Sequence, residues 1–300
     1  MLKRRAPRSP TRPKCQGRRF SNREIGELGV LAILAACHVL CLLLCLPAMA
    51  GRELISVAAA ASLRDGMEEI ARNYEAQTKE HVELTFGSSG QLMAQIKAGA
   101  PIDAFVSAAE AQVKELAKAG LVDQQSRKVI AGNELVVIVP AKSSEDITSF
   151  EDLAKAKKVA IGEPGSVPAG TYAQQVLRKL SLSEKMKNHI VYGTNVRQVL
   201  DYVRRGEVSA GIVYATDAKE AGEEVKVVAK AQPSWHEPIV YPSVIVTRSD
   251  KRDAAKRFLE YLAGDQAQRV LKAKGFAPAL APTSAPAPAP ASKSQGTKGT

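Results

Sequence analysis

Ile55-Ser-Val-Ala-Ala-Ala-Ala-Ser62 and Val82-Glu-Leu-Thr-Phe-Gly87-Ser-Ser-Gly90 are two apolar, strand-like runs that each stop at a serine. A helical pattern starts directly after each run. Behind the first, apolar residues from Met67 to Tyr74 keep the i, i+3, i+4, i+7 spacing of a helix that lies on a sheet. Strand-then-helix units of this kind predict an α/β fold with mostly parallel sheets flanked by helices.

The same alternation continues to residue 276, and no internal repeat is visible. The predicted strands are Ile55–Ala59, Val82–Phe86, Ala104–Ser107, Leu135–Val139, Val159–Gly162, Ile190–Tyr192, Gly211–Tyr214, Val225–Ala229 and Val240–Thr247. The predicted helices are Leu63–Glu75, Leu92–Ala98, Glu110–Ala119, Ala169–Lys179, Val196–Arg205 and Ala254–Leu262. Ligands of open α/β sheets bind beyond the carboxyl ends of the strands, so the strand-to-helix turns are the candidate sites.

The two serine turns are candidate anion sites. Helix N-termini carry unpaired N–H groups and a partial positive charge, and they attract anions without a charged side chain. The alternative is an ordinary capping box, Ser62 with Asp65 and Ser88 with Gln91. Gly87 and Gly90 add backbone that can approach a ligand closely.

A third turn runs from Gly162 to Thr171 and comes close to a phosphate-binding loop. Thr171 stands where such a loop requires lysine, which argues against nucleotide hydrolysis. Pro168 suits the first position of a helix and leaves Ala169 and Gly170 to offer backbone N–H donors. A helix that merely starts at this proline explains the turn equally well.

Two further turns complete the set. Thr194 or Asn195 can cap the helix that begins near Val196, and Arg197 is expected as a solvated first-turn arginine rather than a ligand group. Tyr214 ends a strand and can point its hydroxyl into a cleft, although buried tyrosines are also common at strand ends.

Both ends of the chain differ from the region between them. Nine Lys/Arg and two acidic residues precede the apolar stretch Leu28–Leu46, which is followed by Pro47-Ala48-Met49-Ala50. This pattern predicts an export signal over residues 1–50, with a retained membrane anchor as the alternative and a lipoprotein-like Leu34-Ala-Ala-Cys37 box as a third interpretation. Residues 277–300 are rich in Pro and Ala and predict a disordered tail.

Composition excludes several classes of function. All four cysteines lie within residues 1–50, so the expected mature chain has no thiol chemistry. The formal charge of +11 falls to +4 without that segment, which does not suit a nucleic-acid-binding protein. No nucleophile elbow or metal-spaced His/Cys cluster accompanies His81, His189 and His236, so we expect neither an enzyme nor a site for a free metal cation.

The chain resembles the periplasmic molybdate-binding proteins of ABC importers over about residues 53 to 276, because several short sequence segments match that family and occur in the same order. The matching phrases are Val57-Ala-Ala-Ala-Ala-Ser62-Leu, Phe86-Gly-Ser-Ser89, Ala98-Gly-Ala-Pro-Ile-Asp103-Ala-Phe-Val-Ser-Ala, Val167-Pro-Ala-Gly-Thr-Tyr172-Ala, Val196-Arg197 and Gly211-Ile-Val-Tyr214. The resemblance implies a two-lobed class II binding-protein fold whose cleft takes molybdate or tungstate. Gly87 and Gly90 stand where close relatives often have Ala or Ser.

The resemblance also implies roles for individual residues. It implies that Ser62 and Ser89 bind the oxyanion through hydroxyl and N–H, Ala169 and Val196 through backbone N–H, and Tyr214 through its hydroxyl. Molybdenum would thus be held as an oxyanion, with no further cofactor.

Two chain crossings between lobes are implied as well. Lobe one would hold residues 51–132 and 238–276, and lobe two residues 133–237. The expected partners are an ABC permease and its ATPase, and the expected form is a monomer in the periplasm. A receptor for sulfate or another small oxyanion or organic anion is the alternative.

Overall fold

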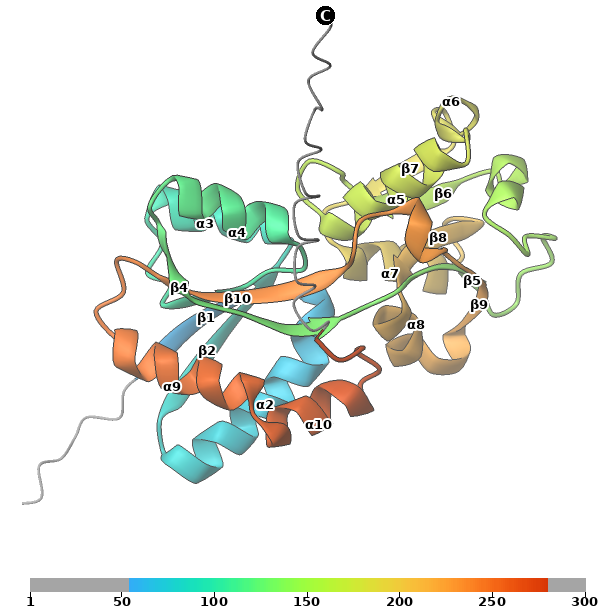
Figure 1. Ribbon diagram of the computed structural model, residues 1–300. Coiled ribbons are helices and arrows are strands. Elements are labelled where there is room, and N and C mark those ends of the chain that lie inside the picture. The colour runs from blue at the N-terminus through green and yellow to red at the C-terminus, as the bar shows by residue number, and fades with distance from the viewer. Residues whose placement is uncertain (1–53, 280–300) are drawn as a thin grey trace, which may run out of the picture. The chain divides into compact units, whose positions relative to one another are not determined.

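The computed structural model describes residues 54–279, which form two five-stranded sheets flanked by helices (Figure 1). The predicted export signal and all but the first residues of the predicted tail lie outside the described residues. Ala277 pairs with Gly132 through two backbone hydrogen bonds of 2.8 and 3.0 Å. No helix between residues 54 and 279 combines the length and the apolar character that a membrane span requires.

The first sheet has the strand order β2-β1-β3-β10-β4. Its strands are β1 (Leu54–Ala60), β2 (His81–Gly87), β3 (Ala104–Val106), β4 (Val122–Gly132) and β10 (Val240–Val246). The helices that follow or cover these strands are α2 (Arg64–Thr78), α3 (Ser89–Ala98), α4 (Glu110–Lys118), α9 (Arg252–Ala263) and α10 (Asp265–Ala273). In Figure 1, α3 and α4 lie on one face of the sheet, and α2, α9 and α10 lie on the other.

The second sheet has the strand order β7-β6-β8-β5-β9. Its strands are β5 (Leu135–Pro140), β6 (Val159–Gly162), β7 (Ile190–Gly193), β8 (Ala210–Tyr214) and β9 (Val225–Lys230). Its helices are α5 (Pro168–Lys179), α6 (Ser183–Met186), α7 (Val196–Arg204) and α8 (Ala215–Ala221). Short 3-10 turns are η1 (Ala61–Leu63), η2 (Glu151–Lys155), η3 (Gly222–Glu224) and η4 (Pro233–Trp235).

Each sheet contains one reversed strand. β10 is antiparallel to both of its neighbours in the first sheet, and β5 is antiparallel to both of its neighbours in the second. The chain passes from one sheet to the other twice, between Gly132 and Leu135 and again between Lys230 and Val240. In sequence order, each reversed strand is the first strand after such a passage. The remaining strands of each sheet run in a common direction, which confirms the predicted mostly parallel α/β fold.

The expectation from the sequence omitted β4 and the short helices α6, α8 and α10. β4 is an edge strand whose middle, from Asp123 to Val129, is polar or partly exposed, so it lacks a run of buried apolar side chains. Without such a run, the sequence pattern of a strand is weak. Six of its eleven residues instead pair with β10, where the register shifts twice.

Candidate functional site

The predicted site lies at the ends of the strands, and these strand ends surround one small cavity, whose empty volume including open solvent is about 210 Å³. The first sheet contributes the ends of β1 and β2, and the second contributes the turns after β6, β7 and β8. All five residues singled out from the sequence line this cavity: Ser62, Ser89, Ala169, Val196 and Tyr214. The other lining residues are Ala60, Ala61, Gly87, Ser88, Ala108, Val167, Pro168 and Asn195. None of these lining residues carries a charge.

The two serines at the start of α3, Ser88 and Ser89, have different structural roles. Ser88 is the N-cap and forms a capping box with Gln91, as the alternative interpretation predicted for this pair. Ser89 is the first helical residue, and its backbone N–H belongs to the turn that has no carbonyl partner within the helix. The Ser89 hydroxyl oxygen accepts the Ala108 N–H at 2.9 Å, which leaves the hydroxyl proton free to donate.

Ser62 is not a helix cap. It lies inside η1 and is 3% exposed, and its Oγ is 3.0 Å from the Tyr241 Oη. Asp65 forms no capping box with it, because the Asp65 carboxylate pairs with Arg197. The capping-box interpretation was therefore wrong for this turn.

The opposite wall is built by two helix N-termini of the second sheet. α5 begins at Pro168 after the N-cap Val167, so Ala169 is its second residue. α7 begins at Val196 after Asn195, whose side chain caps the helix by accepting the Gln198 N–H at 3.1 Å. The N–H groups of Ala169 and Val196 thus belong to first turns, where donors lack partners within the helix.

Tyr214 adds a hydroxyl to this wall. The residue is 1% exposed, and its Oη is buried without a hydrogen-bond partner among the described residues. Burial raises the pKa of Tyr214 well above its ordinary value, so the phenol is a donor at neutral pH. An unpaired buried hydroxyl is unfavourable, and in native structures such a group calls for a specific explanation. A ligand acceptor in the cavity would supply one.

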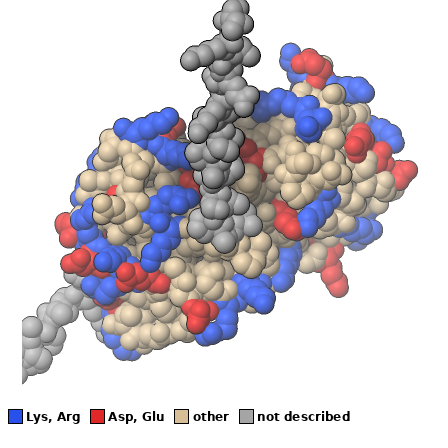
Figure 2. Space-filling view, in the orientation of Figure 1, with Lys and Arg blue, Asp and Glu red and all other residues tan. Residues whose placement is uncertain are grey.

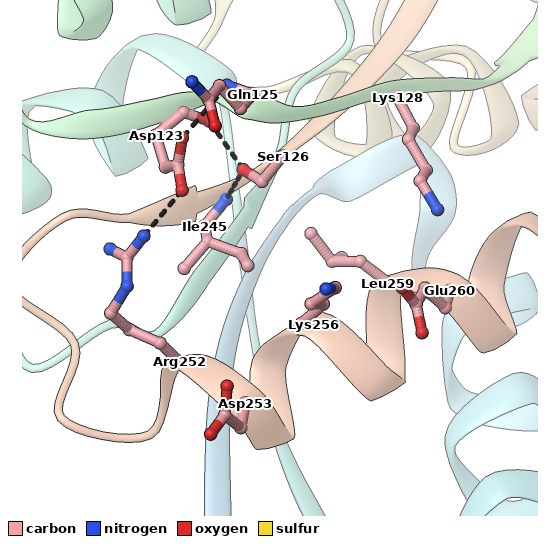
Figure 3. A pocket seen from close by; sticks show the side chains of 10 residues that line it. All are labelled: Asp123, Gln125, Ser126, Lys128, Ile245, Arg252, Asp253, Lys256, Leu259 and Glu260. Carbon is pink, nitrogen blue, oxygen red and sulfur yellow. Dashed lines mark hydrogen bonds and ion pairs between the residues drawn. The ribbon is translucent and has the colours of Figure 1, made fainter.

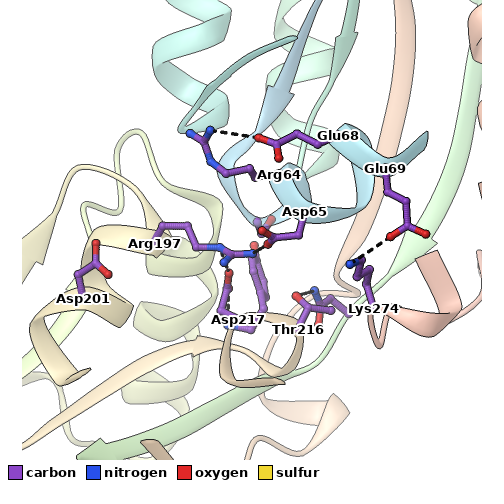
Figure 4. A network of polar contacts seen from close by, with 12 residues as sticks. Arg64, Asp65, Glu68, Glu69, Arg197, Asp201, Thr216, Asp217 and Lys274 are labelled. Carbon is purple, nitrogen blue, oxygen red and sulfur yellow. Dashed lines mark hydrogen bonds and ion pairs between the residues drawn. The ribbon is translucent and has the colours of Figure 1, made fainter. Parts of the chain in front are cut away.

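Arg197 was expected to be solvated, and this expectation was wrong. The guanidinium lies between two carboxylates, with Nε at 2.8 Å from Asp217 Oδ1 and an ion pair to Asp65 (Figure 4). Its side chain is 20% exposed, and that of Asp217 is 0% exposed. Arg197 and Asp217 belong to the second sheet's helices, whereas Asp65 is on α2 beside the first sheet. The positive charge is therefore used to join the two halves rather than to face the cavity.

A second contact between the halves involves Gly90. Its N–H donates to the carbonyl oxygen of Ser166 at 2.8 Å. A Cβ at position 90 would lie only 2.6 Å from the Ser166 Cα. The sequence predicted close approach of Gly87 and Gly90 to a ligand. Gly87 lines the cavity, but Gly90 approaches the backbone of the opposite half.

A larger pocket lies elsewhere, between β4, β10 and α9 (Figure 3). Its empty volume is about 830 Å³, and it contains none of the residues predicted for the site. Arg252 pairs with Asp123 across it at 2.6 Å, so two of its charges already satisfy each other. Figure 2 shows Lys and Arg interspersed with Asp and Glu over both halves. Residues 54–279 contain no cluster of three or more His, Cys, Asp or Glu suited to a metal ion.

A family model described as bacterial extracellular solute-binding protein matches residues 55–277. The chain belongs to this solute-binding family. Its members are components of transport rather than enzymes, so the family assigns the chain to binding. The described two-sheet architecture and the cavity between the sheets are consistent with that role.

Named relatives of this solute-binding protein narrow the resemblance. The chain is 46% identical over 226 residues to YvgL of Bacillus subtilis, whose name describes it as an ABC transporter substrate-binding lipoprotein. The match covers 74% of this chain and 85% of that protein. It is 42% identical over 228 residues to the molybdate-binding protein ModA of Haemophilus influenzae, covering 74% and 89%.

A solved structure gives the same result. The periplasmic molybdate-binding protein of Azotobacter vinelandii matches with a TM-score of 0.67 and 28% identity, over 74% of this chain and 98% of that one. Together these matches confirm the resemblance to molybdate-binding proteins that the sequence motifs indicated.

Proposed function

We propose that this solute-binding protein binds molybdate outside the cytoplasm and delivers it to an ABC permease and its ATPase. The proposal rests mainly on one observation: hydroxyl groups and first-turn N–H donors from both halves converge on a cavity without charged lining residues. The orphaned Tyr214 hydroxyl adds support, because it needs an acceptor. The relatives named molybdate-binding proteins support the same ligand.

The chemistry of the ligand suits such a donor set. A tetrahedral dianion that is unprotonated at neutral pH offers acceptors only, and hydrogen bonds to charged groups contribute roughly 1.5–3 kcal/mol net each. Ser62 and Ser89 would donate through hydroxyl and N–H, Ala169 and Val196 through N–H, and Tyr214 through its hydroxyl. The gross gain is about 10 kcal/mol or more, before the costs of association. Sub-micromolar affinity is thus feasible without lysine or arginine.

Selectivity follows from the same donors and from cavity size. Protonated phosphate brings an O–H for which a donor-only wall has no acceptor. Sulfate has the charge and shape of molybdate but is smaller, so the walls must be held at the distance that suits the larger anion. Tungstate, close to molybdate in size, is proposed as a second ligand. A receptor for sulfate or another small anion is the competing function.

We propose that the two sheets with their helices act as lobes. The passages of the chain between the sheets, between Gly132 and Leu135 and between Lys230 and Val240, support the proposed division into residues 51–132 with 238–276 and residues 133–237. Since the donors are divided between the lobes, the anion meets all of them only when the lobes are closed. A neutral site then releases the anion when the lobes part. The proposal includes export by the N-terminal segment, a periplasmic location and a monomeric receptor.

The deciding experiment is calorimetric titration of the protein from residue 51 onward with molybdate, tungstate, sulfate and phosphate. Sub-micromolar binding of molybdate and tungstate with no measurable binding of the other two is the expected result. Equal affinity for sulfate would replace the proposed function by the competing one.

The first mutational prediction concerns the two serines. Ser62→Ala combined with Ser89→Ala removes two hydroxyl donors to a charged ligand and should weaken molybdate binding at least roughly tenfold. Titration of the double variant measures the loss, and Ser126→Ala, on β4 away from the cavity, is the matched control. Unchanged affinity would mean that neither hydroxyl contacts the anion.

A further inference from the structure

A chain of two hydrogen bonds, the first part-buried and the second buried, leads from the point where the two sheets are connected to the cavity wall. Its members are Asn133, Tyr241 and Ser62, with 3.0 Å between the Asn133 Nδ2 and the Tyr241 Oη and 3.0 Å between the Tyr241 Oη and the Ser62 Oγ. Tyr241 is 0% exposed. Only Ser62 among these three lines the cavity.

The orientation of the Asn133 amide is fixed by its neighbour. Its Oδ1 accepts the Glu134 N–H at 2.9 Å, so the nitrogen is the atom that faces Tyr241 and Thr216. An amide nitrogen only donates. One of its protons is directed to the Thr216 Oγ1 at 2.9 Å and the other to the Tyr241 Oη.

This fixed donor gives the whole chain one direction. The Tyr241 oxygen accepts from Asn133, and among the described residues the Ser62 Oγ is the one acceptor within hydrogen-bond distance of the buried Tyr241 hydroxyl, so the Tyr241 proton is directed to Ser62. The Ser62 oxygen then accepts, and its single proton remains for the cavity. Hydrogen bonds arranged in series polarise one another, so the Ser62 hydroxyl is a stronger donor than an isolated serine.

We propose that Tyr241 is a positioning residue for the oxyanion and acts through Ser62. Asn133 sets the direction of the hydrogen bonds in this Asn133–Tyr241–Ser62 chain, which we call the relay. The proposal rests on the proposed function. Asn133 belongs to the first connecting segment and is bonded to the second, since its N–H donates to the Ile239 carbonyl at 3.3 Å. Through Thr216 of α8 and Tyr241 of β10, the same amide joins the two halves, so the direction of the Ser62 proton depends on their relative placement.

The test is a double-mutant cycle in molybdate affinity with Tyr241→Phe, Ser62→Ala and the combined variant. Phenylalanine keeps the ring contacts with Phe276 at 5.3 Å and Tyr214 at 6.1 Å and removes only the hydroxyl. In the wild-type background we expect Tyr241→Phe to weaken binding roughly fivefold to tenfold. In the Ser62→Ala background we expect no further loss, because the residue acts only through that hydroxyl.

Tyr74→Phe is the matched control. Tyr74 is also a buried tyrosine of the first half, and its hydroxyl donates to Glu80, away from the cavity. We expect it to change thermal stability without changing molybdate affinity, which separates positioning from a general loss of stability. Asn133→Leu should weaken binding more in the wild-type background than once Tyr241 is replaced, because only its bond to Thr216 remains to be lost from the junction in the second case. An effect of the same size in both backgrounds would remove Asn133 from the relay.

Two failures are distinguishable. If wild-type protein does not bind molybdate, the proposed function fails and the relay falls with it. If wild-type protein binds molybdate but Tyr241→Phe costs nothing, or costs the same with and without the Ser62 hydroxyl, the relay alone is overturned. Thermal melting of each ligand-free variant establishes that the compared proteins are folded.

Discussion

The Tyr214 hydroxyl is the residue-scale feature that distinguishes a binding site from a well-packed core. Burying a hydroxyl without a partner is unfavourable, and replacing it by hydrogen relieves that cost. Tyr214→Phe should therefore leave ligand-free stability unchanged or slightly higher, while it weakens molybdate binding by roughly tenfold or more. Thermal melting with and without molybdate measures both effects. A variant that loses stability but keeps its affinity would mean that the hydroxyl serves the fold.

Arg197 and Asp217 give a prediction about pH. Burial raises the pKa of Asp217 from its ordinary 3.8 to about 6, against the opposing effect of Arg197. A raised pKa means that the folded state holds the proton more tightly than the unfolded state, so this stabilisation is lost as pH rises from about 4 through about 6. Arg197→Gln removes the opposing charge and extends the loss to higher pH.

Arg197→Gln should accordingly destabilise the protein by about 3–5 kcal/mol at pH 8, where Asp217 would be buried as an unpaired charge or hold its proton at a cost. At pH 5 the loss should be smaller, because the carboxyl is already protonated in the folded variant. Urea denaturation at both pH values measures the difference. Arg204→Gln, on the same helix but paired with the exposed Glu224, is the control and should cost less than about 1 kcal/mol at either pH.

The site residues show what could be predicted one residue at a time. The turns with Ser62, Ser89, Ala169, Val196 and Tyr214 were recognisable because each follows a strand and starts a helix. Arg197 and Tyr241 were not, since their partners are distant in sequence: Asp65 lies 132 positions from Arg197, and Ser62 lies 179 positions from Tyr241. Local patterns contain no information about such pairs.

At the scale of elements, α5 and β6 depend on two glycines. A Cβ at Gly170 would lie 1.8 Å from the Gly162 carbonyl oxygen, so α5 can lie on β6 only without a side chain there. Gly170→Ala should destabilise the protein by about 3 kcal/mol or more, because the obstructing atoms are backbone and cannot rotate away. Urea denaturation measures the loss. Gly165→Ala, whose Cβ meets nothing within 4 Å, should be neutral, and equal stability of the two variants would contradict this packing argument.

The predicted elements differ from the observed ones for a physical reason. Strands and helices with a buried apolar face, such as β1 and α7, have nearly the expected bounds. β4 and α10 were missed because their place is set by pairing and packing with elements far along the chain, β4 with β10 and α10 with α9 and α2. Such elements form through tertiary contacts rather than through a strong local pattern.

At the scale of the whole molecule, Gly90 and Ser166 form a backbone contact between the two halves, and we expect it to limit how closely the halves approach each other. Besides lying 2.6 Å from the Ser166 Cα, a Cβ at position 90 would lie 2.7 Å from the Ser166 carbonyl oxygen. Nonbonded carbon atoms pack at about 3.5–4.0 Å, so in Gly90→Ala the two halves must lie about 1 Å farther apart at this point than in the wild type. Ser166 precedes Ala169 by three residues, so we expect the proposed donors of the second half to be displaced with it.

Because hydrogen bonds weaken outside about 2.7–3.2 Å, Gly90→Ala should weaken molybdate binding at least about tenfold. Ligand-free stability should change less than the affinity, since the better helix propensity of alanine within α3 offsets part of the loss of the Gly90–Ser166 contact. Calorimetry gives the affinity, and small-angle X-ray scattering at saturating molybdate gives the compaction, which should be smaller than in the wild type. Gly165→Ala, next to the contact but open to solvent, is the control. If the two variants bind and compact alike, the Gly90–Ser166 contact does not limit closure.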